Sequence, residues 1–299
     1  MRAAPPEGGE DRRMNDEDPL PARARRLWET LAAAPVSFAP PGGVRVVVSP
    51  ESGLCPPSWV GVVVLGGAAL VTVPTEAAAR AWERGTAGVP VEALARAETV
   101  RGLVPVTDVL GPATLAYASP EDFRPWTAGA ADPVGARAGE VRAGSEEVRE
   151  LVRSVGREDA DESGMEDITS PAFVVRGGEG AAGTAVVAAA GYEAWPESTA
   201  HVSVLTAAGH RGRGLARRTA SAAVAHALEA GLMPQWRART VESRAVARAL
   251  GFRELGVQLS VRLDELQGRA GPSGAGGSPQ QPTFTREFTG TPRPLSERP

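Results

Sequence analysis

The chain has 299 residues, 42% of them hydrophobic, and a formal net charge of -4, which is the composition of a folded globular protein. This charge excludes a globally basic nucleic-acid-binding protein and leaves only a local basic patch open. The single cysteine, Cys55, excludes an intramolecular disulfide and a multi-cysteine metal site, and the absence of lysine excludes Schiff-base chemistry on a lysine amine.

The N-terminal segment 1–20 is polar and rich in Pro and Gly, so we expect it to be disordered. It lacks the apolar core of a secretory signal, and the longest apolar stretch, 59–73, is interrupted by glycines and too short for a membrane span. The three histidines do not have the spacing of a zinc site. We therefore expect a cytoplasmic protein that binds no metal and no membrane.

Residues 21–124 predict an N-terminal α/β domain. Leu20, Leu27 and Leu31 have near-helical spacing and Pro35 ends the segment, which predicts a first helix. Valine-rich runs predict strands at 44–50, 59–66 and 68–74, and a further strand is expected at 111–118. The segment 74–85 is expected to be helical, with Thr75 as N-cap and Gly85 near the C-terminus.

A Pro/Gly/Ala-rich linker at 125–138 is expected to separate this block from a second domain at 139–266, and 267–299 is expected to be a disordered tail. The second block predicts a mixed α/β fold in a regular order of elements. Helices are expected at 145–156, 215–231 and 242–251, strands at 171–177, 182–195, 199–206, 233–240 and 257–263, and an acidic loop at 157–170.

The segment 211–216, with the sequence RGRGLA, joins a predicted strand to a predicted helix. Glycines allow an anion to approach the backbone closely, and the first N–H groups of a helix are unpaired and carry partial positive charge. A plain turn with solvated arginines is an equally good interpretation of these six residues alone. The Walker loop is excluded because there is no lysine, and the spacing does not fit the dinucleotide-binding fingerprint.

With its surroundings, the segment resembles the pyrophosphate loop of the GNAT superfamily of acyl-CoA-dependent N-acetyltransferases, Arg/Gln-x-x-Gly-x-Gly/Ala. Arg211, Gly214 and Ala216 occupy the motif positions. One strand further on, TVESRAVARALGF is similar to the family's second motif helix, with Ser243 before the final LGF. The resemblance covers residues 139 to about 264 and implies an α/β mixed sheet of the GNAT type, preceded by an extra N-terminal α/β domain.

The resemblance also implies a strand that diverges from its neighbour and opens a V-shaped cleft. Pantetheine would pair with the backbone of Val204, Leu205 and Thr206. The pyrophosphate of acetyl-CoA would lie on the amides of residues 212–216. The cofactor-binding residues implied in this loop are Arg211, Gly212, Arg213, Gly214, Leu215 and Ala216.

The catalytic residues are less clearly marked than the loop. Glu193, at the end of a predicted strand, is the candidate base for the amine, and Ser243 is the candidate group near the cofactor. A solvated strand-end carboxylate and a helix-capping serine are the alternatives. His201 is a weaker candidate base. The family's tyrosine and asparagine positions are occupied by Ala247 and Thr240, which are departures from the pattern.

The sequence therefore predicts an N-acetyltransferase that transfers acetyl from acetyl-CoA to a primary amine of a small molecule or peptide. The alternative is a non-catalytic acyl-CoA-binding or regulatory module; a nucleic-acid patch is a weaker interpretation, because aromatic content is low. Ten acidic residues and four Arg between positions 140 and 167 are suited to a cationic amine, or form only a solvated loop. The first block lacks the loop motif and is interpreted as a degenerate GNAT-like copy that covers the cleft or supplies part of the substrate site without binding cofactor.

Overall fold

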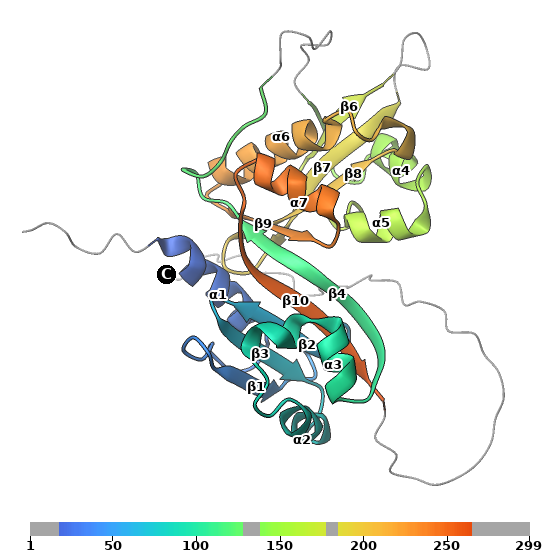
Figure 1. Ribbon diagram of the computed structural model, residues 1–299. Helices are drawn as coiled ribbons and strands as arrows, with labels where there is room; N and C mark the ends of the chain where they lie inside the picture. The colour runs from blue at the N-terminus through green and yellow to red at the C-terminus, as the bar shows by residue number, and fades with distance from the viewer. Residues whose placement is uncertain (1–17, 128–137, 178–184, 265–299) are drawn as a thin grey trace, which may run out of the picture.

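The computed structural model describes residues 18–127, 138–177 and 185–264, which form a mixed ten-stranded sheet with helices on both faces (Figure 1). This confirms the expected mixed α/β class. Most of the segments expected to be disordered or linking, 1–20, 125–138 and 267–299, lie outside the described residues, and so does the turn between the strands expected at 171–177 and 182–195. The domain boundaries drawn from the sequence remain a prediction.

The first part of the chain folds as the valine-rich runs and capping residues predict. Thr75 caps its helix by accepting a hydrogen bond from the Ala78 amide at 3.1 Å. The elements are α1 Pro19–Leu31, β1 Val44–Val48, β2 Val60–Leu65, β3 Ala68–Val73, α2 Glu76–Gly85, the 3-10 helix η1 Val91–Ala95, α3 Ala97–Leu103 and β4 Val106–Tyr117. The short helices η1 and α3 and the early start of β4 were not expected.

The second part contains three elements that the sequence did not predict, β5, α5 and the short 3-10 helix η3. Its elements are β5 Gly139–Val141, α4 Glu146–Arg153, α5 Arg157–Ser163, β6 Ala172–Arg176, β7 Val186–Trp195, β8 Thr199–Thr206, the 3-10 helix η3 Ala208–His210, α6 Leu215–Glu229, β9 Met233–Ala238, α7 Val241–Ala249 and β10 Arg253–Leu263.

The expectation of an acidic loop at 157–170 was wrong for its first half, because 157–163 is the helix α5. Glu158 and Asp159 lie in its first turn, where negative charge is favourable to the helix dipole. The helix ends at Gly164, which has the left-handed conformation of a C-terminal cap (φ 60°). The acidic first turn and the C-terminal glycine were not recognised from the sequence, because the polar composition of this segment is also typical of a loop.

The strand order shows that the two parts share one sheet. The order is β1-β3-β2-β10-β4-β9-β8-β7-β6-β5. The last strand, β10, thus lies antiparallel between β2 and β4, both of which come from the first part. β4 in turn pairs antiparallel with β9 over four residue pairs. The long strands β4 and β10 therefore connect the two parts, as Figure 1 shows.

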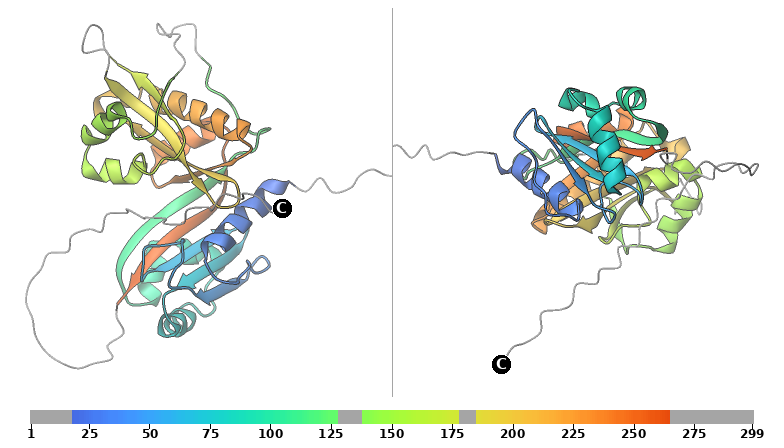
Figure 2. Two further views of the ribbon diagram at one scale, coloured as in Figure 1. Left: turned by 180° about the vertical axis from the view of Figure 1, so that it is seen from behind. Right: turned by 90° about the horizontal axis from the view of Figure 1, so that it is seen from below.

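The helices cover both faces of this sheet (Figure 2). On one face α1 packs on Leu115 and Tyr117 of β4, and α4 packs on β6 and β7. On the other face α6 and α7 pack on Ala116 of β4 and on Trp236 of β9, and α2 packs on the strands of the first part. Successive residues of a strand point to opposite faces, so this alternation gives α1 and α4 one face and α6 and α7 the other.

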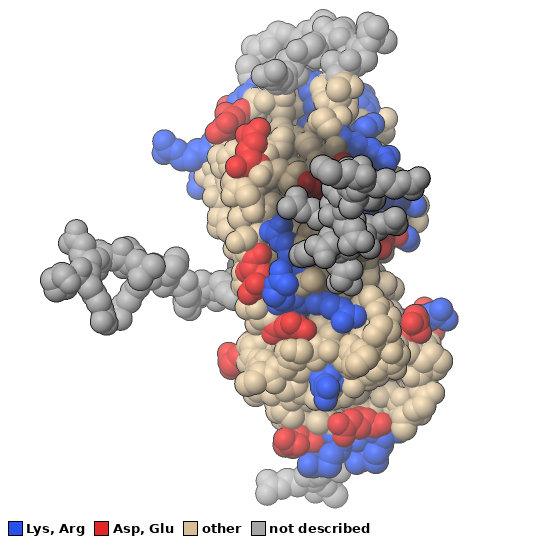
Figure 3. Space-filling view, turned by 90° about the vertical axis from the view of Figure 1, so that its left-hand side faces the viewer, with Lys and Arg blue, Asp and Glu red and all other residues tan. Residues whose placement is uncertain are grey.

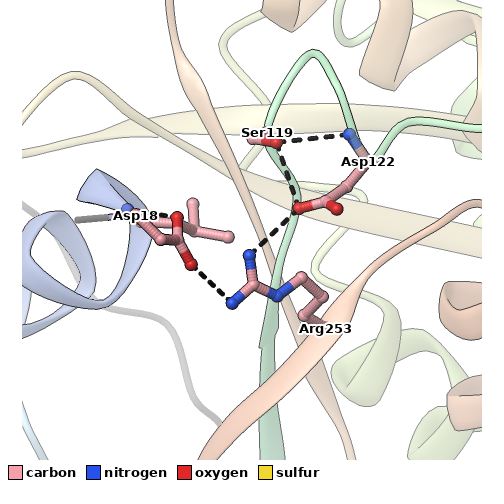
Figure 4. Close-up of polar contacts among 5 residues, drawn as sticks. Asp18, Ser119, Asp122 and Arg253 are labelled. Atoms are coloured by element: carbon pink, nitrogen blue, oxygen red, sulfur yellow. Dashed lines mark hydrogen bonds and ion pairs between the residues drawn. The ribbon is translucent and has the colours of Figure 1, made fainter. Parts of the chain in front are cut away.

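Arg253, the first residue of β10, joins three segments of the chain (Figure 4). Its guanidinium lies 2.5 Å from the Asp18 carboxylate and 3.3 Å from that of Asp122. Asp18 also caps α1 by accepting a hydrogen bond from the Leu20 amide at 3.1 Å. The Arg253 hydrogen bond, together with this amide, lowers the pKa of Asp18. Ser119 in turn donates to Asp122 at 3.0 Å, which fixes the loop after β4.

Candidate active site

Strands β8 and β9 are paired for only part of their length. β8 pairs with β7 from Thr199 to Thr206, but with β9 only at Thr199, Ala200 and His201. From Val202 onward, β8 has no strand partner on the β9 side within the described sheet. The residues expected to meet pantetheine, Val204, Leu205 and Thr206, all lie in this unpaired stretch, whose backbone can accept an extended ligand.

A glycine-rich loop follows β8 and leads into α6. Gly214 is the N-cap of α6 and has φ 74°, and Gly212 has φ 76°. No side chain caps the helix, and a Cβ built on either glycine meets no atom within 4 Å. The first N–H groups of α6 are therefore left for an external acceptor, as an anion site requires. Leu215 packs on Val175 and Val187, which holds the start of the helix against the sheet.

The arginines around this loop have different environments. Arg211 donates from Nε to the Thr206 carbonyl at 3.3 Å and from Nη2 to Asp159 at 2.7 Å, so it fixes the loop to β8 and α5. Arg213 is exposed. Arg218 is buried under the ring of Trp126, with 5.1 Å from its guanidinium carbon to the ring centroid. The Nε atoms of Arg217 and Arg218 are buried without a hydrogen-bond partner among the described residues.

A cavity of about 380 Å³ lies beside the unpaired part of β8, on the sheet face that carries α1 and α4. Its lining comes from both parts of the chain. The second part contributes α5 and residues of β7, β8 and β9, while the first part contributes Leu31 at the end of α1, Trp59 and the stretch Asp108–Gly111 of β4. The volume is that of a small-molecule site.

Glu193 lines this cavity and lies directly opposite His201 in the β7–β8 ladder. Its carboxylate accepts a hydrogen bond from Trp195 Nε1 at 2.7 Å. Arg237, on β9, also lines the cavity, and its Nη1 lies 3.4 Å from Gln258 Oε1. Burial lowers the pKa of the Arg237 guanidinium, and the charge of Glu193 opposes that change. Glu193 is thus a cavity carboxylate within the electrostatic influence of the half-buried Arg237 guanidinium.

His201 also lines the cavity but is poorly suited to accept a proton. Its ring stacks on Trp195 at 4.1 Å between centroids, and its Nδ1 lies 2.5 Å from Gln235 Oε1. Because Oε1 can only accept, Nδ1 carries the hydrogen and Nε2 is the remaining acceptor. Burial and the Arg237 charge lower the pKa of His201 to about 3, against a smaller opposing effect of the Gln235 hydrogen bond. His201 is therefore neutral at physiological pH.

Ser243 lies apart from Glu193. Its Oγ accepts a hydrogen bond from Trp236 Nε1 at 2.9 Å, which places it on the α6 and α7 face of the sheet, and it does not line the cavity. Trp236 points away from the face to which its neighbour Arg237 contributes. The structure thus brings Glu193 and His201 together and puts Ser243 across the sheet from them.

The sequence gives no sign that Trp59, Asp108 and Arg237 belong to the cavity. Trp59 and Asp108 come from the first part, and their position depends on the sheet order, which has no local signal. Arg237 lies on the strand expected at 233–240, and the sequence pattern gave no role to this arginine.

Within the described residues, no group of three or more His, Cys, Asp or Glu side chains could hold a metal ion. No helix in the described part of the chain is long and apolar enough to span a membrane. On the face drawn in Figure 3, basic and acidic side chains lie next to one another in several places.

Residues 178–256 match the family model of the GNAT acetyltransferase. The matched range contains the diverging strand β8, the glycine-rich loop and both motif segments, so this part of the chain is a GNAT acetyltransferase domain, as the motifs indicate. No curated protein is similar enough in sequence to be matched.

Several solved structures are similar to part of the chain. A GNAT-family acetyltransferase structure from Novosphingobium aromaticivorans is 20% identical, with 52% of this chain and 65% of that one aligned at a TM-score of 0.37. A GCN5-related N-acetyltransferase from Kribbella flavida is 18% identical, with 56% and 62% covered at a TM-score of 0.40. This chain thus covers slightly less than two thirds of the length of each of these two structures. Because both TM-scores are low, the assignment rests on the family model and the motifs.

Proposed function

We propose that this protein is an acetyl-CoA-dependent N-acetyltransferase acting on a primary amine. The proposal rests on one observation: two stretches of backbone that leave hydrogen-bonding groups unpaired within the described structure follow one another along the chain. β8 loses its β9 partner after His201, and the uncapped N-terminus of α6 follows with Gly212 and Gly214 unobstructed. One surface suits the extended pantetheine arm and the other suits its pyrophosphate.

The residues around the loop are compatible with a phosphate-bearing ligand. The buried Nε atoms of Arg217 and Arg218 have no partner among the described residues, and donors left unpaired in this way cost free energy unless a ligand or water satisfies them. Arg211 is held by Asp159 and the Thr206 carbonyl. In the proposal it therefore shapes the loop, while the amides of residues 212–216 bind the anion; the Arg211 amide itself donates to the Ala208 carbonyl.

The amine would approach from the cavity. Its nitrogen attacks the thioester carbonyl, the carbon–sulfur bond breaks, and coenzyme A leaves as the thiolate while the nitrogen loses a proton. Glu193 is the proposed acceptor of that proton, since it is a carboxylate at the cavity wall beside the unpaired part of β8. Neutral His201 offers Nε2 as a hydrogen-bond acceptor for the amine.

Ser243 is proposed to act near the thiol from the other face of the sheet. Its Oγ already accepts from Trp236, which leaves the hydroxyl hydrogen free to donate to a developing thiolate. Ala247 occupies the position where the family resemblance expects a tyrosine acid. This departure favours keeping the alternative, an acyl-CoA-binding module without catalysis.

An assay for release of the coenzyme A thiol distinguishes the proposed transferase from the non-catalytic acyl-CoA-binding module. We expect wild-type protein with acetyl-CoA to release thiol when a primary amine is added, and Glu193→Gln to lower kcat by about a hundredfold or more. The glutamine oxygen can still accept from Trp195. The matched control is Glu197→Gln, because Glu197 contacts Thr30 at 3.0 Å and does not line the cavity.

The outcomes have distinct meanings. Acetyl-CoA binding without thiol release for any amine would establish the non-catalytic alternative. Full activity in Glu193→Gln would remove Glu193 from the proposed mechanism while leaving the transfer reaction in place.

A further inference from the structure

Trp195, the last residue of β7, contacts three groups with different parts of its side chain. Its Nε1 donates to Glu193 Oε2 at 2.7 Å, and its ring stacks on His201 with 4.1 Å between the centroids and 14° between the planes. The ring also meets Trp28 of α1 edge to face, at 6.4 Å and 86°. One indole thus contacts both candidate groups of the acceptor site and also the first part of the chain.

Trp28 is held in place by two elements of the first part. It is fully buried among the core residues of α1, and its Nε1 donates to the Tyr117 hydroxyl on β4 at 2.6 Å. Tyr117 is fully buried as well. Because side chains in a close-packed core keep one rotamer, and because the hydrogen bond fixes the plane of the indole, Trp28 offers a rigid surface to its neighbours.

Trp195 depends on such a surface for its own orientation. It is half-buried at the end of its strand, where a side chain keeps more rotamer freedom than in the core. Its N–H can stay on the Glu193 carboxylate only if the ring keeps one orientation. The stack on His201 restrains the ring from one side, and the contact with Trp28 restrains it from another.

We propose that α1 positions the base of the acetyl-transfer site: Trp28 fixes the ring of Trp195, and Trp195 fixes the Glu193 carboxylate. This inference rests on the proposed function and gives the first part of the chain a role in the chemistry. Trp28 does not line the cavity, so it acts through Trp195 as a positioning residue. Since misplacing a catalytic group by about 1 Å can lower a rate by about a hundredfold, loss of this support is measurable in kcat.

Two substitutions test the path from α1 to the carboxylate. Trp195→Phe removes the N–H donor and keeps an aromatic ring, and we expect kcat to fall roughly tenfold because the Glu193 carboxylate loses its fixed orientation. Trp28→Phe should lower kcat roughly fivefold. The dissociation constant for acetyl-CoA should be unchanged in both variants, because the loop at 211–216 lies outside these contacts. An unchanged kcat in Trp28→Phe would overturn the inference.

Trp82→Phe is the matched control for the loss of a buried indole. Trp82 is fully buried in the same part of the chain, but it packs on the other face of the sheet and does not line the cavity. It should keep the wild-type kcat. An equal loss of kcat in Trp82→Phe and Trp28→Phe would assign the effect to general destabilisation and contradict the inference. Tyr117→Phe keeps both indoles, should lower kcat roughly threefold, and tests the same path if Trp28→Phe does not fold.

A double-mutant cycle tests whether Trp28 acts through Trp195. If it does, Trp28→Phe should lower kcat no further once Trp195→Phe has removed the hydrogen bond to Glu193. Effects of the two substitutions that multiply would place Trp28 on a separate path and contradict the inference.

Solvent exchange of the indole N–H groups, followed by NMR, separates this inference from the proposed function. The chain has six tryptophans, and the Trp195 signal is identified by its loss in Trp195→Phe. This N–H should exchange faster in Trp28→Phe and in Glu193→Ala, and at the wild-type rate in Trp82→Phe. If no amine releases thiol, the transferase proposal fails, but these rates would still show that α1 positions the carboxylate. A wild-type rate in Trp28→Phe would overturn the inference whether or not acetyl is transferred.

Discussion

At the scale of single residues, the candidate site contains two groups that could each serve as a base, and their surroundings differ. Glu193 is a carboxylate fixed by Trp195 and lies beside Arg237. Burial, together with the charge of Arg237, lowers the pKa of His201, because both disfavour its protonated form. The geometry therefore assigns proton uptake to the carboxylate and hydrogen-bond acceptance to the imidazole.

The depressed pKa of His201 has a consequence for stability. Its folded value of about 3 lies below the usual 6.5, so below pH 6.5 the unfolded chain binds a proton that the folded chain does not. Stability is unaffected by this group above pH 6.5 and falls as the pH drops toward 3. Between pH 6 and 4, we expect the loss to approach roughly 1 kcal/mol per pH unit.

Urea unfolding at several pH values measures this effect as a difference between variants. His201→Gln should lose less stability than wild type between pH 6 and 4, and His210→Gln should behave as wild type. A wild-type slope retained in His201→Gln would show that His201 titrates normally in the folded protein.

At the scale of elements, Arg253 is the residue through which α1, the loop after β4 and β10 are connected. Arg253→Ala removes ion pairs to Asp18 and Asp122. Because these groups are largely accessible to solvent, we expect Tm to fall by only roughly 2 °C. Arg248→Ala is the matched control, since Arg248 has a single 3.9 Å contact with Glu254. An equal change in both variants, measured by thermal unfolding, would contradict a connecting role.

The same scale shows what sequence reasoning could reach. Helices with clear caps, such as the one that Thr75 begins, and valine-rich strands such as β2 have local signals and were predicted. α5 was missed because its exposed, acidic sequence has few buried side chains to give an apolar period. β5 is three residues long and depends on β6 for its pairing.

Some residues of the candidate site could likewise be predicted from the sequence, and others could not. The loop at residues 211–216 has a motif that can be read from the chain, and Glu193 was identified as a strand-end carboxylate at the position it occupies. Trp59 and Asp108 could not be placed, because their approach to β7 and β8 follows from the long-range pairing of β4 with β9 and β10.

At the scale of the whole molecule, the position of β10 determines how the two parts cooperate. Since β10 lies between β2 and β4, the two parts share a continuous sheet, and β4 extends from the first part to β9 of the second. Figure 1 shows these two strands running between the upper and lower groups of helices. The cavity lies where the two parts meet, so a change in either part can alter the proposed acceptor site.

The central claim is that acetyl-CoA binds on the loop before α6, and calorimetric titration tests it most directly. Gly214→Glu places a charged side chain on the proposed anion site. Gly88→Glu is the matched control, because Gly88 has the same φ of 74° and an equally unobstructed Cβ position in a different loop. We predict micromolar binding in wild type and Gly88→Glu and none in Gly214→Glu. Absence of binding to wild type at high micromolar acetyl-CoA, or equal binding by both variants, would contradict the claim.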